Sequence, residues 1–418
     1  MAAPTATAAD VQRRTVANLV ASQALGGVGV STGIAVIVLL AEDILGSAGL
    51  AGLPQSAQVF GSAAGAYGIA ALSQRAGRRI GLAAGYATGA SGAVLCVLAA
   101  VVSSFALLMI GAALLGCATA ANSQARFAAT DLAPATGRAR ALSIVVWATT
   151  IGAVLGPNLV GLAGNGAAAV GLPELAGALV LAGLGTGLAA GFLQWRLRPD
   201  PLLLSRELAD GDADGDPGAP RPHVLTVLRE HPRAIAGMVA VAAGHVTMVS
   251  VMVMTPLHMD HGGADLELVG FVISIHVLGM FAFAPLVGWY TDRAGQRVVL
   301  LTGAAILLAA VTLAGRSPEG ASGSLVAGLF LLGLGWSCTL VAGSTMLTEA
   351  VPLPDRPTVQ GTSDLVMGVC AGIGGAAGGW VVATWGFNIL NVAAGFVALA
   401  VVVVAVVVRR MVTEPVGA

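Results

Sequence analysis

Twelve apolar segments, each close to the length of a membrane-spanning helix, constrain this chain more than any other feature of its sequence. A helix needs about 20 apolar residues to cross the hydrocarbon core of a bilayer. Hydrophobic residues make up 56% of the 418 residues and charged residues only 10%, whereas soluble domains carry roughly 25% charged residues. The sequence therefore predicts an all-α membrane protein with twelve transmembrane helices and excludes a soluble α/β enzyme. The predicted spans are Val16–Leu40, Leu53–Leu72, Ile80–Val102, Phe105–Ala129, Ala141–Gly161, Leu175–Trp195, Ala234–Met254, Leu268–Tyr290, Val298–Leu313, Leu325–Leu347, Val359–Ala383 and Ile389–Val408.

A polar stretch divides the twelve segments into two sets of six. Residues 199–232 are rich in Pro, Gly and Asp, most densely over Gly211–Gly218. Because such a composition cannot bury an apolar face, we expect a flexible cytoplasmic linker here. The predicted domains are an N-terminal six-helix bundle (1–198), this linker (199–232) and a C-terminal six-helix bundle (233–418).

The arginines predict the orientation of the chain in the membrane. All 20 basic residues are arginine, and 19 of them fall at the termini, in alternate loops or in the central linker; Arg316 is the exception. Positively charged loops stay in the cytoplasm. We therefore expect a multi-pass protein of the cell membrane with both termini cytoplasmic.

An internal repeat relates the two sets of spans. The segment Arg75-Ala-Gly77-Arg-Arg79 after span 2 matches Arg293-Ala-Gly295-Gln-Arg297 after span 8. Gly156 in span 5 and Gly375 in span 11 are separated by almost the same stretch of chain. Two pseudo-symmetric six-helix bundles are the pattern of transporters that expose a central site to each side of the membrane in turn.

The loop after span 8 carries a recognisable motif. The segment Gly288-Trp-Tyr-Thr-Asp292-Arg293-Ala-Gly295-Gln-Arg297 resembles the loop signature G-x-x-x-D-R-x-G-x-R of the major facilitator superfamily. The first-half copy departs from it, with Ala70 for the glycine and Gln74 for the acid. Glu349 and Asp355 end span 10, so we expect them to meet first-half arginines in a cytoplasmic gate. The symmetry of the repeat then predicts that Asp292 meets Arg138 or Arg140. The predicted gate residues are Asp292, Arg293, Arg297, Arg75, Arg78, Arg79, Arg138, Arg140, Glu349 and Asp355.

A second motif lies in span 5. The segment from Gly152 through Gly156 and Pro157 to Gly161 resembles the G-x-x-x-G-P-x-x-G-G signature of the drug:proton antiporter branch of that superfamily. Glycines four residues apart allow close helix packing, and the proline bends the helix. Ordinary packing of small residues is the alternative explanation. The arginine that many antiporters carry in span 4 is replaced by Ala112.

Four ionisable residues lie inside the predicted spans, where a charge is costly and often functional. Asp364 is the first proton-coupling candidate, because loss of water favours a carboxyl that binds a proton; pairing with Arg75, Arg78 or Arg79 as a latch is equally compatible with the sequence. His245 and His276 are the other candidates, although a neutral histidine bonded to a helix carbonyl is the commoner arrangement. Arg126 either replaces the missing span 4 arginine, or extends to the interface or pairs locally.

Polar and aromatic residues at helical spacing predict a mostly apolar central cavity with few polar anchors. Tight helix packing produces the same stripes of small residues. Such a cavity suits amphipathic solutes better than sugars. The cavity candidates are Asn18, Ser22, Gln58, Ser62, Arg126, Trp147, Asn158 and Trp336.

Together these features predict a secondary transporter that exports small amphipathic molecules in exchange for protons. A metabolite symporter or facilitator on the same fold, and a non-transporting membrane sensor, are the alternatives. We expect a monomer in the lipid bilayer that binds a small-molecule substrate and protons, with no enzyme activity, cofactor, metal site or nucleic-acid partner. The sequence contains no lysine and no GxxxxGK[ST] loop for ATP.

Overall fold

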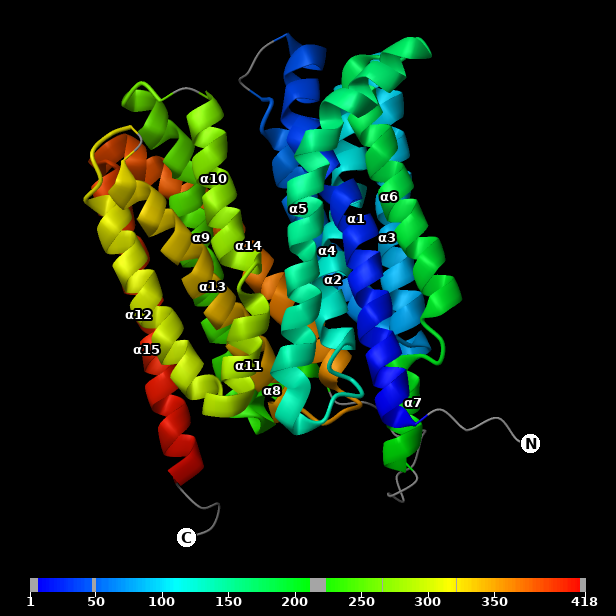
Figure 1. The fold of residues 1–418 in the computed structure, drawn as a ribbon, viewed down its shortest axis with the longest axis vertical. Helices are drawn as coiled ribbons and strands as arrows, with labels where there is room; N and C mark the ends of the chain where they lie inside the picture. Colours follow the sequence, from blue (N-terminus) through cyan, green and yellow to red (C-terminus); the bar gives the residue numbers. More distant parts are fainter. Residues whose placement is uncertain (1–6, 47–49, 211–222, 265, 321, 414–418) are drawn as a thin grey trace. The chain divides into compact units, whose positions relative to one another are not determined.

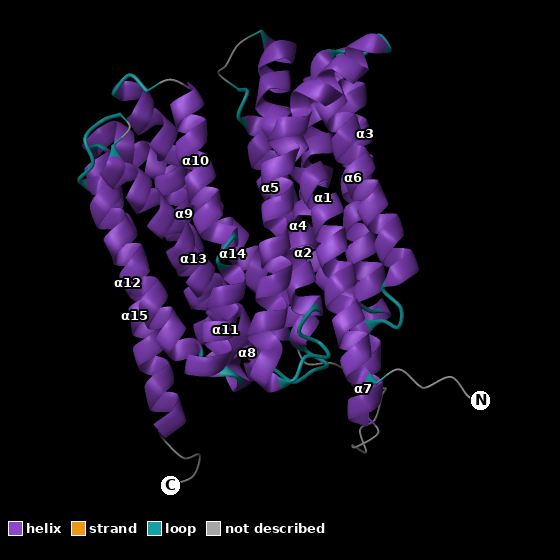
Figure 2. Cartoon of the chain, in the orientation of Figure 1, coloured by secondary structure: helices purple, strands orange, loops and turns teal. Residues whose placement is uncertain are grey.

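Helices account for the fold of the described part of the chain, which comprises residues 7–46, 50–210, 223–264, 266–320 and 322–413 of a computed structural model (Figures 1 and 2). Within these residues no strand occurs, and the predicted all-α class is confirmed. The side chains of residues 210, 266, 267 and 407–413 are not described. The helices are α1 (Ala8–Leu45), α2 (Leu53–Ala76), α3 (Arg78–Val102), α4 (Phe105–Ala128), α5 (Arg138–Ala169), α6 (Glu174–Arg196), α7 (Pro201–Asp210), α8 (Val224–Glu230), α9 (Pro232–His261), α10 (Leu266–Phe281), α11 (Ala284–Ala294), α12 (Gln296–Gly315), α13 (Gly323–Ala350), α14 (Arg356–Trp385) and α15 (Phe387–Thr413), with a short 3-10 turn at Ala135–Gly137.

Local sequence signals explain where several helices begin and end. The first helix starts with a capping box, in which the Thr7 hydroxyl accepts from the Asp10 amide and the Asp10 carboxylate accepts from Thr7. Gly77 between α2 and α3 has a φ of 89°, and Gly295 between α11 and α12 has a φ of 85°. Only glycine adopts such angles without strain. The repeated Arg-Ala-Gly triplet therefore encodes the same tight turn in both halves of the sequence.

The chain forms two compact units whose boundaries do not follow the two halves of the sequence. The first turns of α5 belong with the second half, and the segment that leads into α14 and its first turns belongs with the first half. Unit 1 consists of residues 1–134, 148–222 and 353–365, and unit 2 of residues 135–147, 223–352 and 366–418.

Helices pack in the same order inside each unit. In unit 1, α6 packs against α1 and α3, and α4 packs against α2 and α3. In unit 2, α15 packs against α9 and α12, and α13 packs against α10 and α12; Figure 1 shows α12 and α15 running side by side. The predicted repeat is thus present in the packing as well as in the sequence.

Eleven stretches among the described helices are long and apolar enough to span a membrane. The second predicted span, α2, is the one that falls short of that criterion among the described helices; it carries Gln55, Gln58 and Gln74 along with several serines. The eighth predicted span is broken, because α10 ends at Phe281 and α11 starts at Ala284. Pro285 in the first turn of α11 has no amide hydrogen to continue α10, which accounts for the break.

The central linker contains helices where its composition predicts none. The first is α7, in which Leu202 is fully buried, and the second is α8, in which Val227 and Leu228 are buried. Short apolar clusters at both ends of the range, outside its Gly- and Asp-rich middle, account for this difference. Residues 211–222, including Gly211–Gly218, lie outside the described residues.

The span 5 glycine motif contacts α1. A Cβ at Gly152 would lie 2.6 Å from the Cα of Gly27, and the Ser31 hydroxyl donates to the Gly152 carbonyl at 2.6 Å. A Cβ at Gly156 would overlap Ser31. The packing role predicted for Gly161 is wrong, because a Cβ there would meet no atom within 4 Å. Pro157 lies inside α5 without ending the helix.

Substitution of these glycines should separate a packing role from a simple effect of helix propensity. Gly152→Ala is expected to destabilise the protein by about 1–3 kcal/mol because α1 must move away. Gly161→Ala is the matched control and should leave stability unchanged or slightly higher, since alanine is the better helix former. The measurement is thermal unfolding of the detergent-solubilised full chain. Equal melting temperatures for the two variants would contradict the assigned contact.

Candidate functional site

A buried ion pair joins α4 to the first turns of α14 inside unit 1. The Arg126 Nη2 atom contacts the Asp364 Oδ1 atom, and the two side chains are only 4% and 2% exposed. Gln124 Nε2 donates to Asp364 Oδ2 at 2.8 Å, and the Ser123 hydroxyl lies 3.4 Å from the same atom. The carboxylate is therefore held by one guanidinium and two neutral donors from a single turn of α4.

Arg126 also contacts residues of its own helix, α4. Its Nη1 donates to the Ser123 carbonyl at 2.7 Å and contacts the Ser123 hydroxyl. Its guanidinium carbon lies 4.3 Å from the centre of the Phe127 ring. The expectation that Arg126 extends to the membrane interface is wrong, because its side chain is buried against Asp364. Arg126 also pairs locally with Ser123 on α4, in addition to its ion pair with Asp364.

The alternative that Asp364 pairs with Arg75, Arg78 or Arg79 is wrong, because α4 rather than the loop after α2 supplies its arginine. Arg75 is exposed at the end of α2. The Arg79 amide donates to Asp200 Oδ2 at 2.7 Å. Arg78 lies in a second buried ion pair.

That second pair lies in the same unit and includes an acid that the sequence analysis missed. Arg78 Nε donates to Asp131 Oδ2 at 2.8 Å, and both side chains are 0% exposed. Arg78 Nη2 also donates to Gln360 Oε1 at 2.6 Å, which ties α3 to α14. Asp131 follows α4 and resembles part of an exposed loop in the sequence. Its position between Arg126 and Arg138 in an arginine-rich region is the signal that would have found it.

The altered first-half loop still contacts the start of α14. Gln74 Nε2 donates to the Pro354 carbonyl at 3.2 Å, and the Thr358 hydroxyl donates to Gln74 Oε1. The missing loop glycine is compensated on the opposite helix, because a Cβ at Gly361 would overlap the Ala70 side chain. An amide and a relocated glycine thus preserve this contact without the acid.

The intact second-half loop contacts the start of α5 inside unit 2. Asp292 accepts from the Ala139 amide at 3.0 Å and from the Arg140 amide at 2.9 Å. Asp292 meets Arg140 as predicted, but through the backbone amide rather than the side chain. A carboxylate at this position stabilises the positive end of α5. A Cβ at Gly288 would overlap Ser143 of α5, so only glycine fits there.

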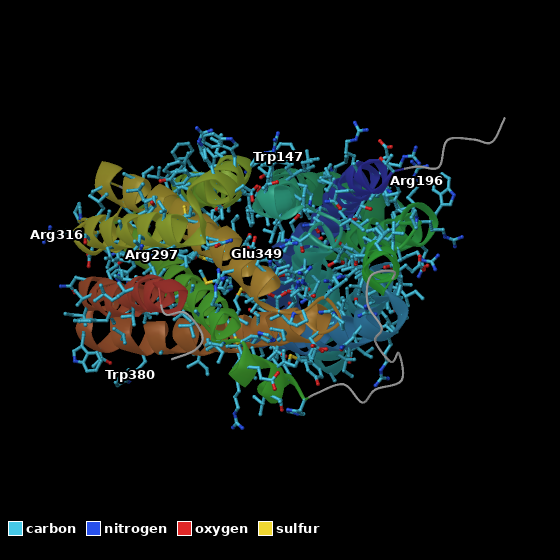
Figure 3. All side chains as sticks on the ribbon, turned by 90° about the horizontal axis from the view of Figure 1, so that it is seen from below. Trp147, Arg196, Arg297, Arg316, Glu349 and Trp380 are labelled. Atoms are coloured by element: carbon cyan, nitrogen blue, oxygen red, sulfur yellow. The ribbon has the colours of Figure 1, made fainter. Side chains whose placement is uncertain are left out.

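Other predicted gate residues have identifiable contacts. Glu349 lies 3.9 Å from Arg138, as predicted, and accepts from Gln296 Nε2 at 2.7 Å. The Arg297 Nε atom donates to the Ala405 carbonyl at 3.0 Å; Figure 3 labels both Glu349 and Arg297. Arg293 lies over the Trp289 ring, 5.7 Å from its centre. Asp355 precedes α14 and its carbonyl accepts from the Val359 amide at 3.2 Å.

The two predicted histidines occupy different environments in unit 2. His245 Nδ1 accepts from Trp336 Nε1 at 2.7 Å, and the Phe281 ring meets the Trp336 ring edge-on at 5.5 Å. His276 is 1% exposed, and its Nδ1 lies 2.8 Å from the Leu329 carbonyl. His276 thus has the carbonyl-bonded arrangement that the sequence analysis gives as the commoner one. His245 belongs to an aromatic cluster that joins α9, α10 and α13.

A polar network inside unit 1 was also missed by the sequence analysis. The Tyr86 hydroxyl lies 3.1 Å from Gln23 Oε1 and 2.5 Å from Asn122 Oδ1, and Gln23 Nε2 donates to Thr149 at 3.2 Å. Four helices contribute to it, and Asn122 lies one turn from Arg126 on α4. Tyr86, a large side chain accommodated by Gly26, resembles an ordinary core aromatic in the sequence.

The cavity candidates do not form one group. Ser22 is buried and donates to the Leu19 carbonyl of its own helix at 2.9 Å. Asn158 likewise donates to the Val154 carbonyl of α5 at 2.7 Å. Trp147 is 39% exposed near the start of α5 (Figure 3). Asn18 lies at one end of α1, where it donates to the Arg196 carbonyl at 2.9 Å.

Gln58 and Ser62 lie on α2, beside α4. Gln58 is 2% exposed, and neither atom of its side-chain amide has a hydrogen-bond partner among the described residues. Ser62 is half-buried, and a Cβ at Gly116 would lie 2.6 Å from its backbone nitrogen. A buried amide without partners costs stability, which makes Gln58 the cavity candidate that the structure best supports.

No group of three or more His, Cys, Asp or Glu side chains in the described ranges has the geometry to hold a metal ion. The arrangement instead offers one carboxylate whose charge is balanced by one arginine in a site shielded from water. Binding of a proton by that carboxylate would remove the attraction that holds α4 to α14.

Comparisons with known proteins cover nearly the whole chain. A sequence model of the Major Facilitator Superfamily matches residues 19–264 and 237–417. The uncharacterized MFS-type transporter YddS of Bacillus subtilis (strain 168) is 36% identical over 405 residues, which cover 97% of this chain and 93% of that protein. The riboflavin transporter RfnT of Brucella anthropi is 27% identical over 365 residues, covering 86% of this chain and 87% of the transporter. Among solved structures, the human organic anion transporter MFSD10 (TETRAN) superposes with a TM-score of 0.73 at 16% identity, over 94% of this chain and 99% of that one.

Removal of either member of the Arg126–Asp364 pair is expected to destabilise the protein more than removal of both. Asp364→Asn leaves a buried guanidinium without its counter-charge, which costs about 3–5 kcal/mol for buried pairs. The double variant Arg126→Met with Asp364→Leu leaves no unbalanced charge and should recover most of that loss. Thermal unfolding of the purified full chain is measured for the wild type, Asp364→Asn, Arg126→Met and the double variant. Additive losses in the double variant would show that the two side chains do not interact.

Proposed function

The chain belongs to the major facilitator superfamily, and we propose that it is a secondary transporter that exports small amphipathic molecules in exchange for protons. The superfamily predicted from the loop motif is confirmed by the family match and by relatives that cover nearly the whole chain. Membership gives a multi-span membrane protein with a transport function. The antiporter branch, the direction of transport and the proton belong to the proposal.

The buried Arg126–Asp364 pair is the observation that carries the proposal. A carboxylate 2% exposed and bound to a guanidinium has two stable arrangements in a low-dielectric site: paired and ionised, or separated and protonated. A proton and Arg126 thus compete for the same carboxylate. Each proton that enters through a potential of about 100 mV supplies about 2.3 kcal/mol, which would drive export.

The contacts around this pair supply a route from protonation to movement. Asp364, Gln360 and Thr358 all lie on the first turns of α14 and bind α4, α3 and α2 respectively. Alternating access requires the helices of the two sequence halves to separate on the side that opens. Protonation of Asp364 removes the strongest of these contacts and so favours that separation.

The side chains available for substrate binding favour an amphipathic solute. Inside unit 1 they are neutral polar groups, namely Gln58 and the network of Gln23, Tyr86 and Asn122. Inside unit 2 they are the aromatic cluster of His245 and Trp336. Apolar walls with a few neutral hydrogen-bonding groups bind partly apolar molecules.

The proposal keeps the domain organisation and location that the sequence predicts. The transport unit is a monomer of two bundles (1–198 and 233–418) joined through residues 199–232, in the cell membrane with both termini in the cytoplasm. The arginines support this orientation, since the turn at Gly77, the loop at Asp131 and the turn at Gly295 all lie on the arginine-rich side.

Uptake of a metabolite on the same fold is the second candidate. It is favoured by the relative named as a riboflavin transporter, which matches 86% of this chain. A panel of solutes that includes riboflavin therefore discriminates between the two candidates.

Everted membrane vesicles that contain the full chain and are energised with a proton gradient test the proposal. Addition of a transported lipophilic cation should release protons from the vesicles, and Asp364→Asn should abolish that release because the carboxyl can no longer exchange a proton. Asp131→Asn is the matched control, since it also removes a buried acid from an arginine pair and should keep the proton-to-solute ratio. Unchanged coupling in Asp364→Asn would overturn the proton site. Riboflavin uptake without proton release would favour the second candidate.

The second-half loop predicts a separate effect on turnover. Asp292→Asn keeps a carbonyl acceptor for one of the two α5 amides but removes the charge that stabilises the helix terminus, an effect of about 0.3–1 kcal/mol. Transport in the same vesicles should slow several-fold while substrate affinity, measured by equilibrium binding to purified protein, stays unchanged. A turnover rate equal to that of the wild type would contradict a gating role for Asp292.

A further inference from the structure

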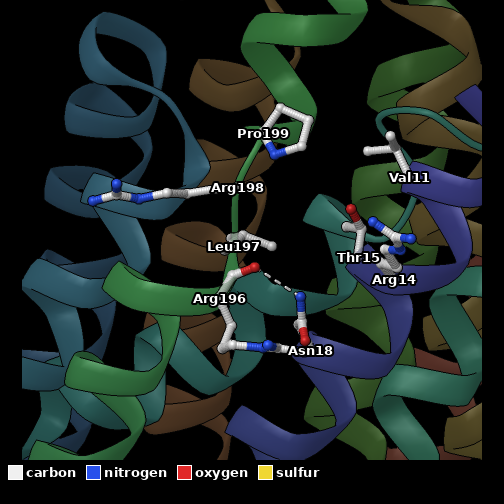
Figure 4. Close-up of a pocket in the computed structure, with 8 residues that line it drawn as sticks. All are labelled: Val11, Arg14, Thr15, Asn18, Arg196, Leu197, Arg198 and Pro199. Atoms are coloured by element: carbon white, nitrogen blue, oxygen red, sulfur yellow. Dashed lines mark hydrogen bonds between the residues drawn. The ribbon is translucent and has the colours of Figure 1, made fainter. Parts of the chain in front are cut away.

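A pocket lies in unit 1 between the first turns of α1 and the end of α6 (Figure 4). Its cavity volume is about 50 Å³, and the pocket is partly open to the surroundings. The Asn18 side chain, which donates to the Arg196 carbonyl at 2.9 Å, connects the two walls. The pocket is lined by Val11, Arg14, Thr15, Asn18, Arg196, Leu197, Arg198 and Pro199.

The pocket is strongly basic. Three of its eight lining residues are arginines and none is acidic. Arg14 comes from α1 and Arg196 from α6, so positive charge faces the space from both walls. The nearest acid on the first turn of α1, Asp10, is bound to Arg13 at 2.6 Å. Asp200, which follows Pro199, accepts from the Arg79 amide. Among the described residues neither Arg14 nor Arg196 forms an ion pair with an acid, so both charges are available to a ligand.

The side chains of the two arginines at the end of α6 point in different directions. In Figure 4 the Arg196 side chain extends toward Asn18 and α1, while the Arg198 side chain extends the opposite way. Arg198 Nε donates to the Gln194 carbonyl at 3.2 Å. Arg198 therefore lines the pocket without directing its guanidinium into it, and Arg14 and Arg196 are the two charged groups available to a ligand.

The surroundings place this pocket at the level of lipid headgroups. On α6, Leu184 is 57% exposed and Leu188 is 60% exposed, as expected for a surface that faces acyl chains. Trp195, 72% exposed, follows them immediately before the pocket, and the Arg196 guanidinium lies 5.3 Å from the centre of its ring. Exposed tryptophans mark the boundary between hydrocarbon and headgroups.

We propose that this pocket binds the phosphate of an anionic phospholipid, with Arg14 and Arg196 as the phosphate ligands. The planar guanidinium forms two parallel hydrogen bonds to a phosphate. Basic pockets between transmembrane helices on the arginine-rich side of a membrane suit anionic headgroups. The acyl chains of such a lipid would lie along the exposed leucines of α6. The bound lipid would hold α1 against α6 just before α7 begins, and this inference does not depend on the transported substrate or on proton coupling.

Native mass spectrometry of the full chain in detergent tests the proposal with phosphatidylglycerol and phosphatidylcholine as probes. The wild type should retain one phosphatidylglycerol in preference to phosphatidylcholine. The double variant Arg14→Gln with Arg196→Gln should lower that affinity roughly 30-fold, since each arginine near an anionic surface contributes about a factor of five. Arg198→Gln is the matched control and should leave the affinity unchanged.

Each other outcome overturns the proposal. Equal retention of the two lipids by the wild type would exclude an anionic headgroup site, whether or not the double variant folds. An equal loss in Arg198→Gln would show general attraction to positive charge instead of a defined pocket. Inorganic phosphate that binds the wild type in phosphatidylcholine nanodiscs as tightly as phosphatidylglycerol does would identify a site for the free anion.

Discussion

Burial of charge away from water is the constraint that organises the arginine-rich end of this protein. Two arginines, Arg78 and Arg126, are withdrawn from solvent, and each is compensated by an acid that is equally buried. A charge without such a partner would cost several kcal/mol. Asp364 lies on α14, and Arg78 also donates to Gln360 of α14. Both buried arginines therefore hold the first turns of α14 within unit 1. The grouping of residues 353–365 with the first half of the sequence follows from these charges.

The duplicated sequence explains how the two loop regions have diverged while keeping the same contacts. Alignment of the two Arg-Ala-Gly triplets makes Gln74 correspond to Asp292 and Ala70 to Gly288. In the second half the loop glycine accommodates Ser143 of α5, whereas in the first half the glycine is Gly361 on α14 and accommodates Ala70. Where the two helices cross, the packing requires a glycine on one of them. Gly288 of α11 provides it in the second half, and Gly361 of α14 provides it in the first half.

The polar contacts of the repeat have diverged in a similar way. In the same alignment Arg78 corresponds to Gln296 and Asp131 to Glu349. The first half has a fully buried ion pair at this place, at 2.8 Å, and the second half has a hydrogen bond between neutral Gln296 and Glu349, at 2.7 Å. Glu349 is also near Arg138 and is less buried. Both halves thus keep a polar contact between these two positions. It is an ion pair in the fully buried first-half site and a hydrogen bond from a neutral amide in the less buried second-half site.

Local patterns in the sequence predicted the parts of the fold that depend on short-range physics. Span lengths, the turns at Gly77 and Gly295, and the all-α class follow from hydropathy and glycine geometry. The Arg126–Asp364 pair did not follow, because its two members are far apart in the chain and hydropathy carries no information about which helices meet. Tyr86 and Asp131 were missed for the same reason, since one resembles a core aromatic and the other a loop acid. The sequence identified Asp364 as unusual, and only packing identified its partner.

The absence of a repeat counterpart separates the Arg126–Asp364 pair from the structural contacts. In the alignment of the two halves, Ser344 corresponds to Arg126 and Val146 corresponds to Asp364. Neither Ser344 nor Val146 has an ionisable side chain. The contacts that hold the loops together are present twice, at Gln74 and Asp292 and at Asp131 and Glu349, as expected if the fold itself requires them. An ion pair buried to this extent adds little stability over apolar residues of similar size, so packing alone does not account for its presence in one half. A role that needs one titratable group per molecule would account for it. This asymmetry supports the proposal that Asp364 carries the proton and that the duplicated contacts belong to the gate.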